Sequence, residues 1–267
     1  MCFKWTRFFL LAVFLLSGLR PAMSEQKPNV IIIFNDDQGY QDLGCYGSPD
    51  IKTPHVDRLA AEGMRFTDFY VASPVCSASR AALLTGCYPY RVGVPSVFWP
   101  NRAHGLSPEY LTLAEVLKSA GYATKAVGKW HLGDEPQFLP INQGFDSYYG
   151  IPYSNDMYPA RTMKYADDCL YLEGFTPEKI EAVFAELKKG QPKTLKNKVP
   201  LMRDRACIEF PCDQTTITRR YGDESIEFIN QCAAETKPFF LYLANTMPHI
   251  PLFASPDFRG KSARGLY

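Results

Sequence analysis

The sequence has few histidines, no closely spaced cysteine pair and, after its first two dozen residues, no long apolar run. It holds four histidines, and none of its eight cysteines form a Cys-x-x-Cys pair. Thiolate metal sites and thioredoxin-type redox sites need such pairs, so both classes are disfavoured. A membrane-spanning helix needs about 18 consecutive apolar residues, and we expect none in the rest of the chain. A large positive excess is also absent, since 29 Lys and Arg face 28 Asp and Glu, which argues against nucleic acid as a partner.

Residues 1–24 are predicted to be a secretory signal peptide. Lys4 and Arg7 precede an apolar stretch over residues 8–16, and small residues follow it. This order is typical of a cleaved signal, because the apolar core is too short to span a bilayer. An uncleaved anchor is the alternative. The protein is therefore expected to be secreted, or delivered to a periplasmic or lumenal compartment.

Removal of this segment changes the charge and the cysteine count. It takes away three basic residues and no acidic one, which leaves 26 basic against 28 acidic residues and a formal net charge of −2. About 243 residues remain, enough for one large core or two modest domains. Seven cysteines remain, and in an oxidising compartment an odd number leaves one thiol unpaired.

Apolar stretches with β-branched residues alternate with helical patterns along the chain. Strands are predicted at residues 29–34 (a buried strand), 66–71, 122–127 and 239–244. Helices are predicted at residues 56–63, 78–85, 112–120, 177–189 and 216–234. Strands separated by helices imply an α/β fold with a mostly parallel central sheet and helices on both faces. The lysine-rich segment 190–214 is predicted to be an irregular surface excursion.

In a parallel sheet of this kind, ligands bind beyond the carboxyl ends of the strands. Asp36 and Asp37 directly follow the first predicted strand. Adjacent carboxylates repel each other unless a cation neutralises them, and hard oxygen ligands favour calcium or magnesium. A turn with two solvated acids is the alternative.

Two of the four histidines also follow predicted strands. Lys129 and His131 come after the third strand, where alternation would place both side chains on one side. The pair combines a fixed cation with a titratable base, which suits holding an anion and moving a proton. His249 follows the last strand, in a loop stiffened by prolines. A surface lysine and packed histidines are the alternative, and His55 and His104 are assigned no role.

Cys76 stands at the start of a predicted helix, with Arg80 one turn later, and a packing cysteine is the simpler interpretation. The stretch Cys-Ser-Ala-Ser-Arg between them resembles the Cys-x-Pro/Ala-x-Arg signature of the sulfatase family, and the Leu-Thr-Gly that follows resembles its continuation. Residues 28–47, 128–133 and 150–156 resemble further blocks of this family. The likeness is closest to the arylsulfatase A type, within the alkaline-phosphatase-like superfamily.

The resemblance implies a formylglycine-dependent sulfatase. In this family a maturing enzyme oxidises the signature cysteine to formylglycine, so Cys76 is expected to carry that modification, which would account for the odd thiol. At a helix N-terminus, backbone N–H groups favour an anion. One hydroxyl of the formylglycine hydrate would attack sulfur, and the other would later expel sulfate. The resemblance also implies a calcium ion bound by Asp36, Asp37 and the modified Cys76.

The remaining site residues follow from the resemblance by position. Arg80 would hold the formylglycine and the metal-side carboxylates, and Lys129 would hold the sulfate and the hydrate. His131 would act as the base at the hydrate, while His249 would face the leaving oxygen and contact the substrate. Ser154 would form a hydrogen bond with the sulfate. The substrate would be a sulfate monoester, either an aryl sulfate or a sulfated sugar.

Two departures from the family pattern shape the expectation for this chain. The family usually has arginine after Thr-Gly, where this chain has Cys87. The pattern also stops before the family's Asp-Asn metal pair and a further active-site lysine. Residues 25–267 are therefore expected to be the N-terminal part of a truncated sulfatase catalytic domain. Since calcium takes about 6 to 8 oxygen ligands, this part alone is expected to show no turnover.

Two other functions stay open. A phosphoester hydrolase of the same superfamily would share the fold and the metal carboxylates, although it would more often use a serine or threonine nucleophile. A non-catalytic secreted remnant is the second alternative. Candidates for lining a substrate cleft are Trp99, Tyr153 and Tyr158, with core or surface positions as the alternative. A disulfide is expected from Cys169 to Cys207 or Cys212, where it would restrain the irregular segment.

Overall fold

The computed structural model describes residues 27–186 and 193–267. The expected signal peptide, the last residues of the helix expected at 177–189 and the first residues of the segment 190–214 lie outside this part. The strands are β1 (Val30–Phe34), β2 (Ala123–Gly128), β3 (Ser147–Gly150), β4 (Tyr165–Tyr171), β5 (Leu201–Arg203), β6 (Ala206–Phe210) and β7 (Phe239–Ala244). The α-helices are α2 (Pro54–Glu62), α3 (Cys76–Thr85), α4 (Leu113–Ser119), α5 (Pro177–Glu186) and α6 (Ile217–Ala234).

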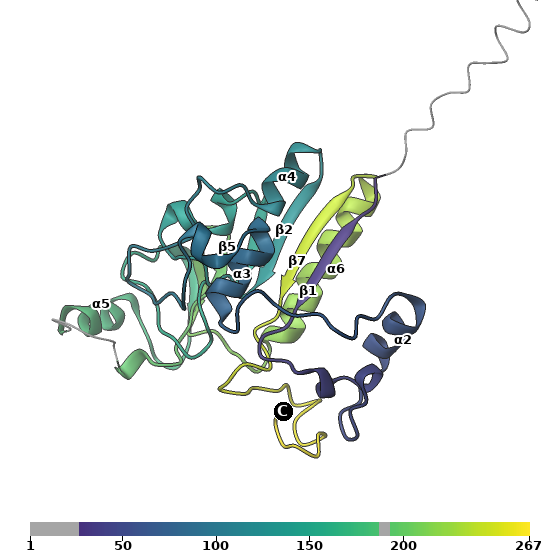
Figure 1. The fold of residues 1–267 in the computed structure, drawn as a ribbon. Coiled ribbons are helices and arrows are strands. Elements are labelled where there is room, and N and C mark those ends of the chain that lie inside the picture. The colour runs from purple at the N-terminus through teal and green to yellow at the C-terminus, as the bar shows by residue number, and fades with distance from the viewer. Residues whose placement is uncertain (1–26, 187–192) are drawn as a thin grey trace, which may run out of the picture.

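The strands of the described residues form one sheet in the order β1-β7-β2-β3-β5-β6-β4. β1, β7, β2 and β3 run parallel to one another, β5 runs antiparallel to both of its neighbours, and β4 pairs parallel with β6. The expected α/β fold with a mostly parallel sheet is therefore confirmed. Because the parallel strands point the same way, their carboxyl ends meet at one end of the sheet, the lower end in Figure 1.

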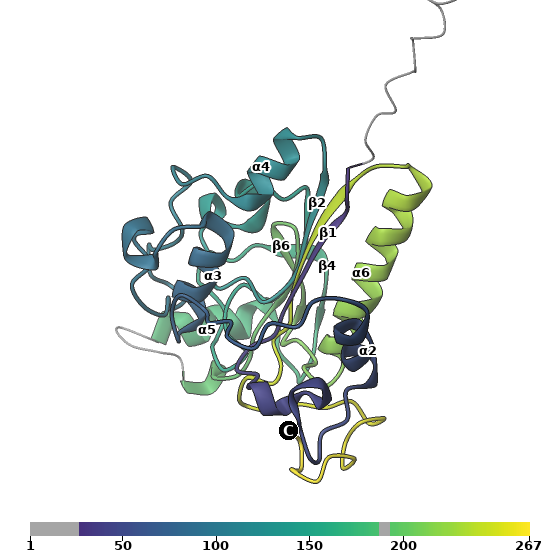
Figure 2. The ribbon, with the colours of Figure 1, turned by 45° about the vertical axis from the view of Figure 1, so that its right-hand side comes forward.

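Helices cover both faces of the central strands (Figure 2). Successive side chains of β7 point to opposite faces. Phe240 and Tyr242 pack in the core that α3 and α4 cover, whereas Phe239 and Leu241 pack in the core beneath α6. β7 and its neighbour β2 are thus held between two apolar layers, which fix where both strands end.

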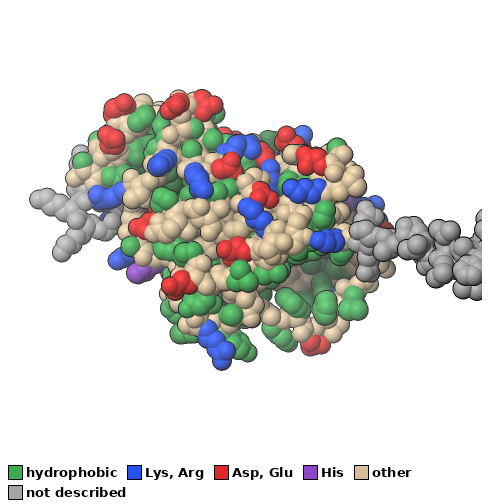
Figure 3. Space-filling view, turned by 90° about the horizontal axis from the view of Figure 1, so that it is seen from above, with side chains coloured by type: hydrophobic (Ala, Val, Ile, Leu, Met, Phe, Trp, Pro, Cys, Tyr) green, Lys and Arg blue, Asp and Glu red, His purple; other side chains and the backbone are tan. Residues whose placement is uncertain are grey.

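The opposite end of the molecule, where the strands begin, carries mixed charges. Figure 3 shows Lys and Arg side chains interspersed with Asp and Glu side chains over this face, without a large patch of one sign. Among the described helices, none is both long and apolar enough to cross a bilayer.

The five predicted helices and three of the four predicted strands are present. α3 begins at Cys76, two residues before the predicted start. α4 begins where its sequence signal places it, because the Thr112 hydroxyl accepts a hydrogen bond from the Glu115 N–H at 3.2 Å and the Glu115 carboxylate accepts one from the Thr112 N–H at 2.7 Å.

Two strand predictions need correction. The strand expected at residues 66–71 is wrong: the segment is irregular, and Phe66 and Tyr70 are exposed, because no neighbouring strand pairs with it. The strand at 29–34 exists, but it is not buried on both faces. β1 lies at the edge of the sheet, and the outer side chains Ile31 and Ile33 are 46% and 56% exposed.

The segment 190–214 is not irregular in its second half. β5 and β6 pair with each other and join the sheet between β3 and β4. Both strands are short, and each also pairs with a strand far away in the chain, so the local pattern did not predict them. β3 has only four residues, and β4 carries two adjacent aspartates, so neither was predicted.

The cysteines in the described part are all free thiols. The sulfurs of Cys169 on β4 and Cys207 on β6 lie 3.9 Å apart. β4 and β6 are adjacent strands, so a disulfide here would need only a small rotation of the two side chains. The pairing of Cys169 with Cys207 therefore stays a prediction.

Gly128 ends β2 in a way that another residue would not allow. It has a φ of +109°, and a Cβ there would lie 1.9 Å from the carbonyl oxygen of Ala244. We expect Gly128→Ala to lower the free energy of unfolding by about 2–4 kcal/mol, since it adds backbone strain to a collision with β7. Gly121→Ala is the matched control, because Gly121 has a φ of +89° but open space around it. Equal losses in thermal unfolding of the two variants would contradict the close approach.

A disulfide between Cys169 and Cys207 should form by thiol–disulfide exchange with oxidised glutathione, which takes up the two electrons as reduced glutathione. Peptide mapping without reduction is expected to recover the two cysteines in one crosslinked peptide. Cys87, which is exposed, should instead carry glutathione or stay free. Recovery of both Cys169 and Cys207 as alkylated free thiols after this treatment would reject the pairing.

Candidate active site

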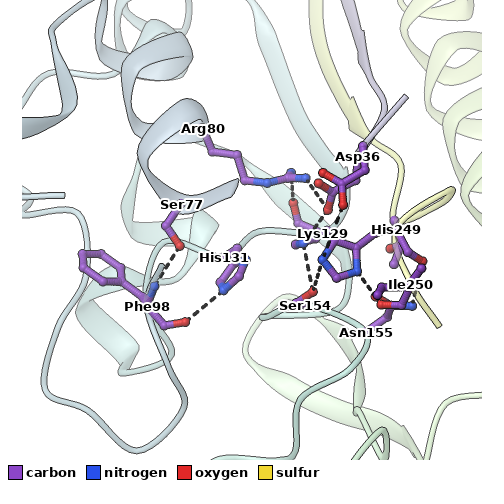
Figure 4. Close-up of polar contacts among 12 residues, drawn as sticks. Asp36, Ser77, Arg80, Phe98, Lys129, His131, Ser154, Asn155, His249 and Ile250 are labelled. Atoms are coloured by element: carbon purple, nitrogen blue, oxygen red, sulfur yellow. Dashed lines mark hydrogen bonds and ion pairs between the residues drawn. The ribbon is translucent and has the colours of Figure 1, made fainter. Parts of the chain in front are cut away.

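Four strand ends and one helix start meet at the carboxyl end of the sheet. Asp36 follows β1, Lys129 follows β2, Ser154 follows β3 and His249 follows β7, while Cys76 is the first residue of α3. Figure 4 shows Asp36, Lys129, Ser154 and His249 pointing toward one another. The structure thus brings together side chains that the sequence placed at separate strand exits.

The Asp36 carboxylate lies at the centre of this group. Its Oδ2 accepts a hydrogen bond from Lys129 Nζ and lies 3.3 Å from Arg80 Nη2. Burial alone would raise the pKa of Asp36, but the charges of Arg80 and Lys129 outweigh it and hold this pKa below its ordinary value. Asp36 is therefore ionised, and it neutralises one of two buried positive charges.

Arg80 reaches this group from the second turn of α3. Its side chain is fully buried, and its Nη1 donates to the Lys129 carbonyl oxygen at 2.7 Å. It also approaches the Tyr242 hydroxyl at 3.4 Å and lies over the Phe34 ring at 5.4 Å. Within the described residues its Nε has no hydrogen-bond partner. A buried donor without an acceptor is costly, so this atom suits an additional anionic group.

Cys76 lies beside His249 and Asp36, since ligand atoms of the three residues fall within 4.8 Å of one another. Burial works against the thiolate, but a hydrogen bond from His249 and the charge of Lys129 outweigh it and lower the pKa of Cys76. The same hydrogen bond is the main cause that raises the pKa of His249. As the first residue of α3, Cys76 also faces the positive end of the helix dipole.

Ser154 and His249 close the other side of the group. The Ser154 hydroxyl accepts from Lys129 Nζ at 3.0 Å and lies 3.4 Å from His249 Nε2. Asn155 holds the His249 loop, because its Nδ2 donates to the carbonyl oxygen of Pro251 at 3.0 Å. Asp37 lies at the rim, with its Oδ2 3.8 Å from His249 Nε2 and a side chain 62% exposed.

His131 is linked to the group through Phe98 rather than through Cys76. Its Nε2 forms a hydrogen bond at 2.9 Å with the Phe98 carbonyl oxygen, and the Phe98 N–H donates to the Ser77 hydroxyl at 3.0 Å. Burial and the charges of Lys129 and Arg80 hold the pKa of His131 well below its ordinary value. The imidazole is therefore neutral. Its φ of +61° shows that the chain has left the regular strand alternation used to predict it.

A cavity of about 180 Å³ opens beside Asp36, Asp37, Cys76 and Arg80. Its two carboxylates are hard oxygen donors, so the lining offers the type of ligand atom that calcium prefers. Asp36 and Asp37 fall short of the six to eight oxygens that calcium takes, and substrate oxygens, water or other donors would have to complete the set. Arg80 also lines this cavity, and its positive charge favours an anion next to it.

Of the three aromatic candidates for a cleft, Tyr153 and Tyr158 are buried core residues, and Trp99 is 40% exposed. Sequence reasoning missed Tyr242 and Phe98. Alternate side chains of β7 point toward α3, and Tyr242 is one of them, so the alternation of the strand could have predicted its position. Phe98 acts through its backbone, and side-chain identity holds no signal for that role.

Asp36→Asn should lower the free energy of unfolding by about 3 kcal/mol near neutral pH, because it leaves the charges of Lys129 and Arg80 buried without a counter-charge. The pKa of Asp36 is depressed by folding, so its contribution is present above its unfolded value of about 3.9 and is lost as pH falls through the lower folded value. Chemical denaturation of both proteins across this range measures the difference.

The matched control is Asp37→Asn, which removes the neighbouring but exposed carboxylate. We expect it to change stability by less than about 0.5 kcal/mol. Similar losses for the two variants, or a loss for Asp36→Asn that persists unchanged at pH 2, would contradict the buried ion pairs described above.

Comparisons with known proteins identify the family of this chain. A family model described as Sulfatase matches residues 28–266. N-acetylgalactosamine-6-sulfatase of Sus scrofa is 38% identical over 284 residues, covering 98% of this chain and 47% of that protein. Arylsulfatase A of Homo sapiens is 39% identical over 241 residues, covering 89% and 44%. The crystal structure of Ps i-CgsB in complex with k-i-k-neocarrahexaose is 35% identical, with a TM-score of 0.68, and the match covers 87% of this chain and 48% of that one.

The chain spans about half the length of the curated relatives that it matches. The family model nevertheless matches nearly all of the chain from residue 28 onward. The chain belongs to the sulfatase family.

Proposed function

We propose that this chain carries the nucleophile-bearing part of a sulfate ester hydrolase site, with Cys76 converted to formylglycine. One observation supports this most strongly. Cys76 is the first residue of α3, and it lies within one small site with Asp36 and His249. The site also holds the buried cations of Lys129 and Arg80. Two cations against one buried carboxylate leave an excess of positive charge, which suits an anionic sulfate ester.

We propose a carbohydrate sulfate or an aryl sulfate as the substrate. The relatives named N-acetylgalactosamine-6-sulfatase and arylsulfatase A support these two classes, and the Ps i-CgsB structure holds a carbohydrate. In this proposal Lys129 Nζ, which already donates to Ser154, turns one N–H toward a sulfate oxygen, and the Ser154 hydroxyl donates to another. Arg80 holds the carboxylate of Asp36 in place through their ion pair.

A formylglycine hydrate supplies two hydroxyls, one that attacks sulfur and one whose deprotonation releases the sulfate. His249 Nε2 lies next to Cys76 and Ser154, where it can give a proton to the leaving oxygen. His131 is neutral, and its Nε2 is engaged by the Phe98 carbonyl oxygen, so its unpartnered Nδ1 is the atom that would accept a proton from the hydrate, against the low pKa that burial gives the ring. Fixed donors around a charge that shifts during the reaction are expected to supply most of the rate.

We propose that Asp36 and Asp37, with the modified Cys76, hold a calcium ion in the cavity beside them. Bound there, calcium would draw electron density from the sulfate oxygens. A maturing enzyme that makes formylglycine is the implied partner. Export by the signal predicted at residues 1–24 would take the chain to the compartment of its substrate.

The modification is tested by mass. When the chain is produced together with a formylglycine-generating enzyme, the peptide that contains Cys76 should lose about 18 Da, the mass difference between cysteine and the aldehyde. In Arg80→Lys the peptide that contains Cys76 should still be detected, but a smaller fraction of it should carry formylglycine, because arginine belongs to the signature. An unmodified Cys76 under conditions that convert a known sulfatase would reject the assignment.

Turnover is tested on a version of the protein that supplies a full set of calcium ligands. Cys76→Ser should lower turnover of an aryl sulfate by at least about 1000-fold, because loss of a covalent nucleophile costs several kcal/mol in the barrier. For residues 25–267 alone we expect no turnover, even with Cys76 converted and calcium present, because their carboxylates fall short of the calcium ligand number. Retention of more than about a tenth of the activity by Cys76→Ser would contradict the nucleophile.

A further inference from the structure

A second cavity, of about 630 Å³, is lined in part by Phe98 and shares no lining residue with the cavity beside Asp36. Trp99, Arg102 and His104 line it, together with Phe98 and Phe138. Figure 4 shows the ring of Phe98 pointing away from His131. Its volume falls in the range of about 300–1,000 Å³ that small-molecule sites occupy.

The cavity is connected to the active site through one residue. The Phe98 carbonyl oxygen is bonded to His131, and the Phe98 N–H is bonded to Ser77, the neighbour of Cys76 in α3. Trp99 follows Phe98 directly in the chain. Phe98 thus belongs both to the wall of this cavity and to the hydrogen-bonded link between His131 and the start of α3.

The floor of the cavity is rigid. A Cβ at Gly105 would lie 2.1 Å from the Phe138 ring, and one at Gly133 would lie 2.6 Å from the Phe138 Cβ. The Phe138 carbonyl oxygen accepts from Trp130 Nε1 at 2.8 Å. Trp130 stands between Lys129 and His131, so the backbone that carries two active-site residues also fixes this floor.

The walls combine an aromatic face with a free cation. Trp99 is 40% exposed and is followed by a buried proline, which holds its backbone. Arg102 is exposed and forms no ion pair with any carboxylate of the described residues. An indole face packs well on the apolar face of a sugar ring, and a guanidinium binds sulfate or carboxylate through two parallel hydrogen bonds.

We propose that this cavity is a subsite for the neighbouring sugar of an anionic glycan, with Trp99 stacked on its ring and Arg102 paired with its sulfate or carboxylate. The proposal rests on the proposed function, because it takes the sulfate ester next to Cys76 as one end of the bound chain. It makes the substrate a sulfated oligosaccharide rather than a small aryl sulfate.

Calorimetric titration of the chain with sugars of different length tests the subsite. The probes are N-acetylgalactosamine 6-sulfate, and disaccharides in which a second sugar linked to it is neutral, carboxylated or sulfated. The wild-type chain should bind the charged disaccharides about tenfold more tightly than the monosaccharide. Trp99→Ala should remove most of this ratio and Trp99→Phe should retain it, while Arg102→Gln should remove the preference for a charged second sugar over a neutral one.

Tyr90→Ala and Arg91→Gln are the matched controls, since both residues are exposed and lie outside the cavity lining. They should leave the ratio within about twofold of the wild type. Equal affinities of the wild-type chain for monosaccharide and disaccharide, or equal effects of Trp99→Ala and Tyr90→Ala, would overturn the subsite. An unmodified Cys76 with a Trp99-dependent ratio would reject the proposed hydrolase and leave the subsite standing.

Discussion

The architecture of the site depends on one buried carboxylate shared by two cations. Asp36 meets Lys129 and Arg80, and the three charges come from β1, β2 and α3. Each charge alone would be costly to bury, so the three elements can pack in this way only if they place the charges together. Asp36, Lys129 and Arg80 together keep one net positive charge, which supports the proposed binding of an anion beside them.

The positions of these charges follow from the sheet. Four parallel strands end at one edge, and Gly128 lets the chain leave β2 against the backbone of Ala244 so that Lys129 turns inward. The same backbone continues to His131 and then to Gly133 beneath the second cavity. The loop after β2 thus carries Lys129, which pairs with Asp36, and also packs against residues that line the second, partly aromatic cavity.

Local sequence patterns were sufficient to predict those site residues that directly follow a strand or begin a helix. Asp36 and His249 follow apolar strands, and Cys76 begins a helix, so strand exits and a helix start could be recognised from the sequence. The pairing of β5 with β3 could not, because it joins residues about 50 positions apart through strands too short to show a period. The role of Phe98 was also hidden, since its backbone makes both contacts. Trp99 was a candidate for the cleft, and only the fold separated it from Tyr153 and Tyr158, which are buried.

The most direct test is a crystal structure of the chain, with Cys76 converted, grown with inorganic sulfate. We expect sulfate at the start of α3, bonded to Lys129 Nζ and Ser154 Oγ, with Asp36 still paired with Arg80. Sulfate bound only elsewhere on the surface, with Lys129 and Asp36 paired as before and no anion beside residue 76, would contradict an anion site at this junction of strands and helix.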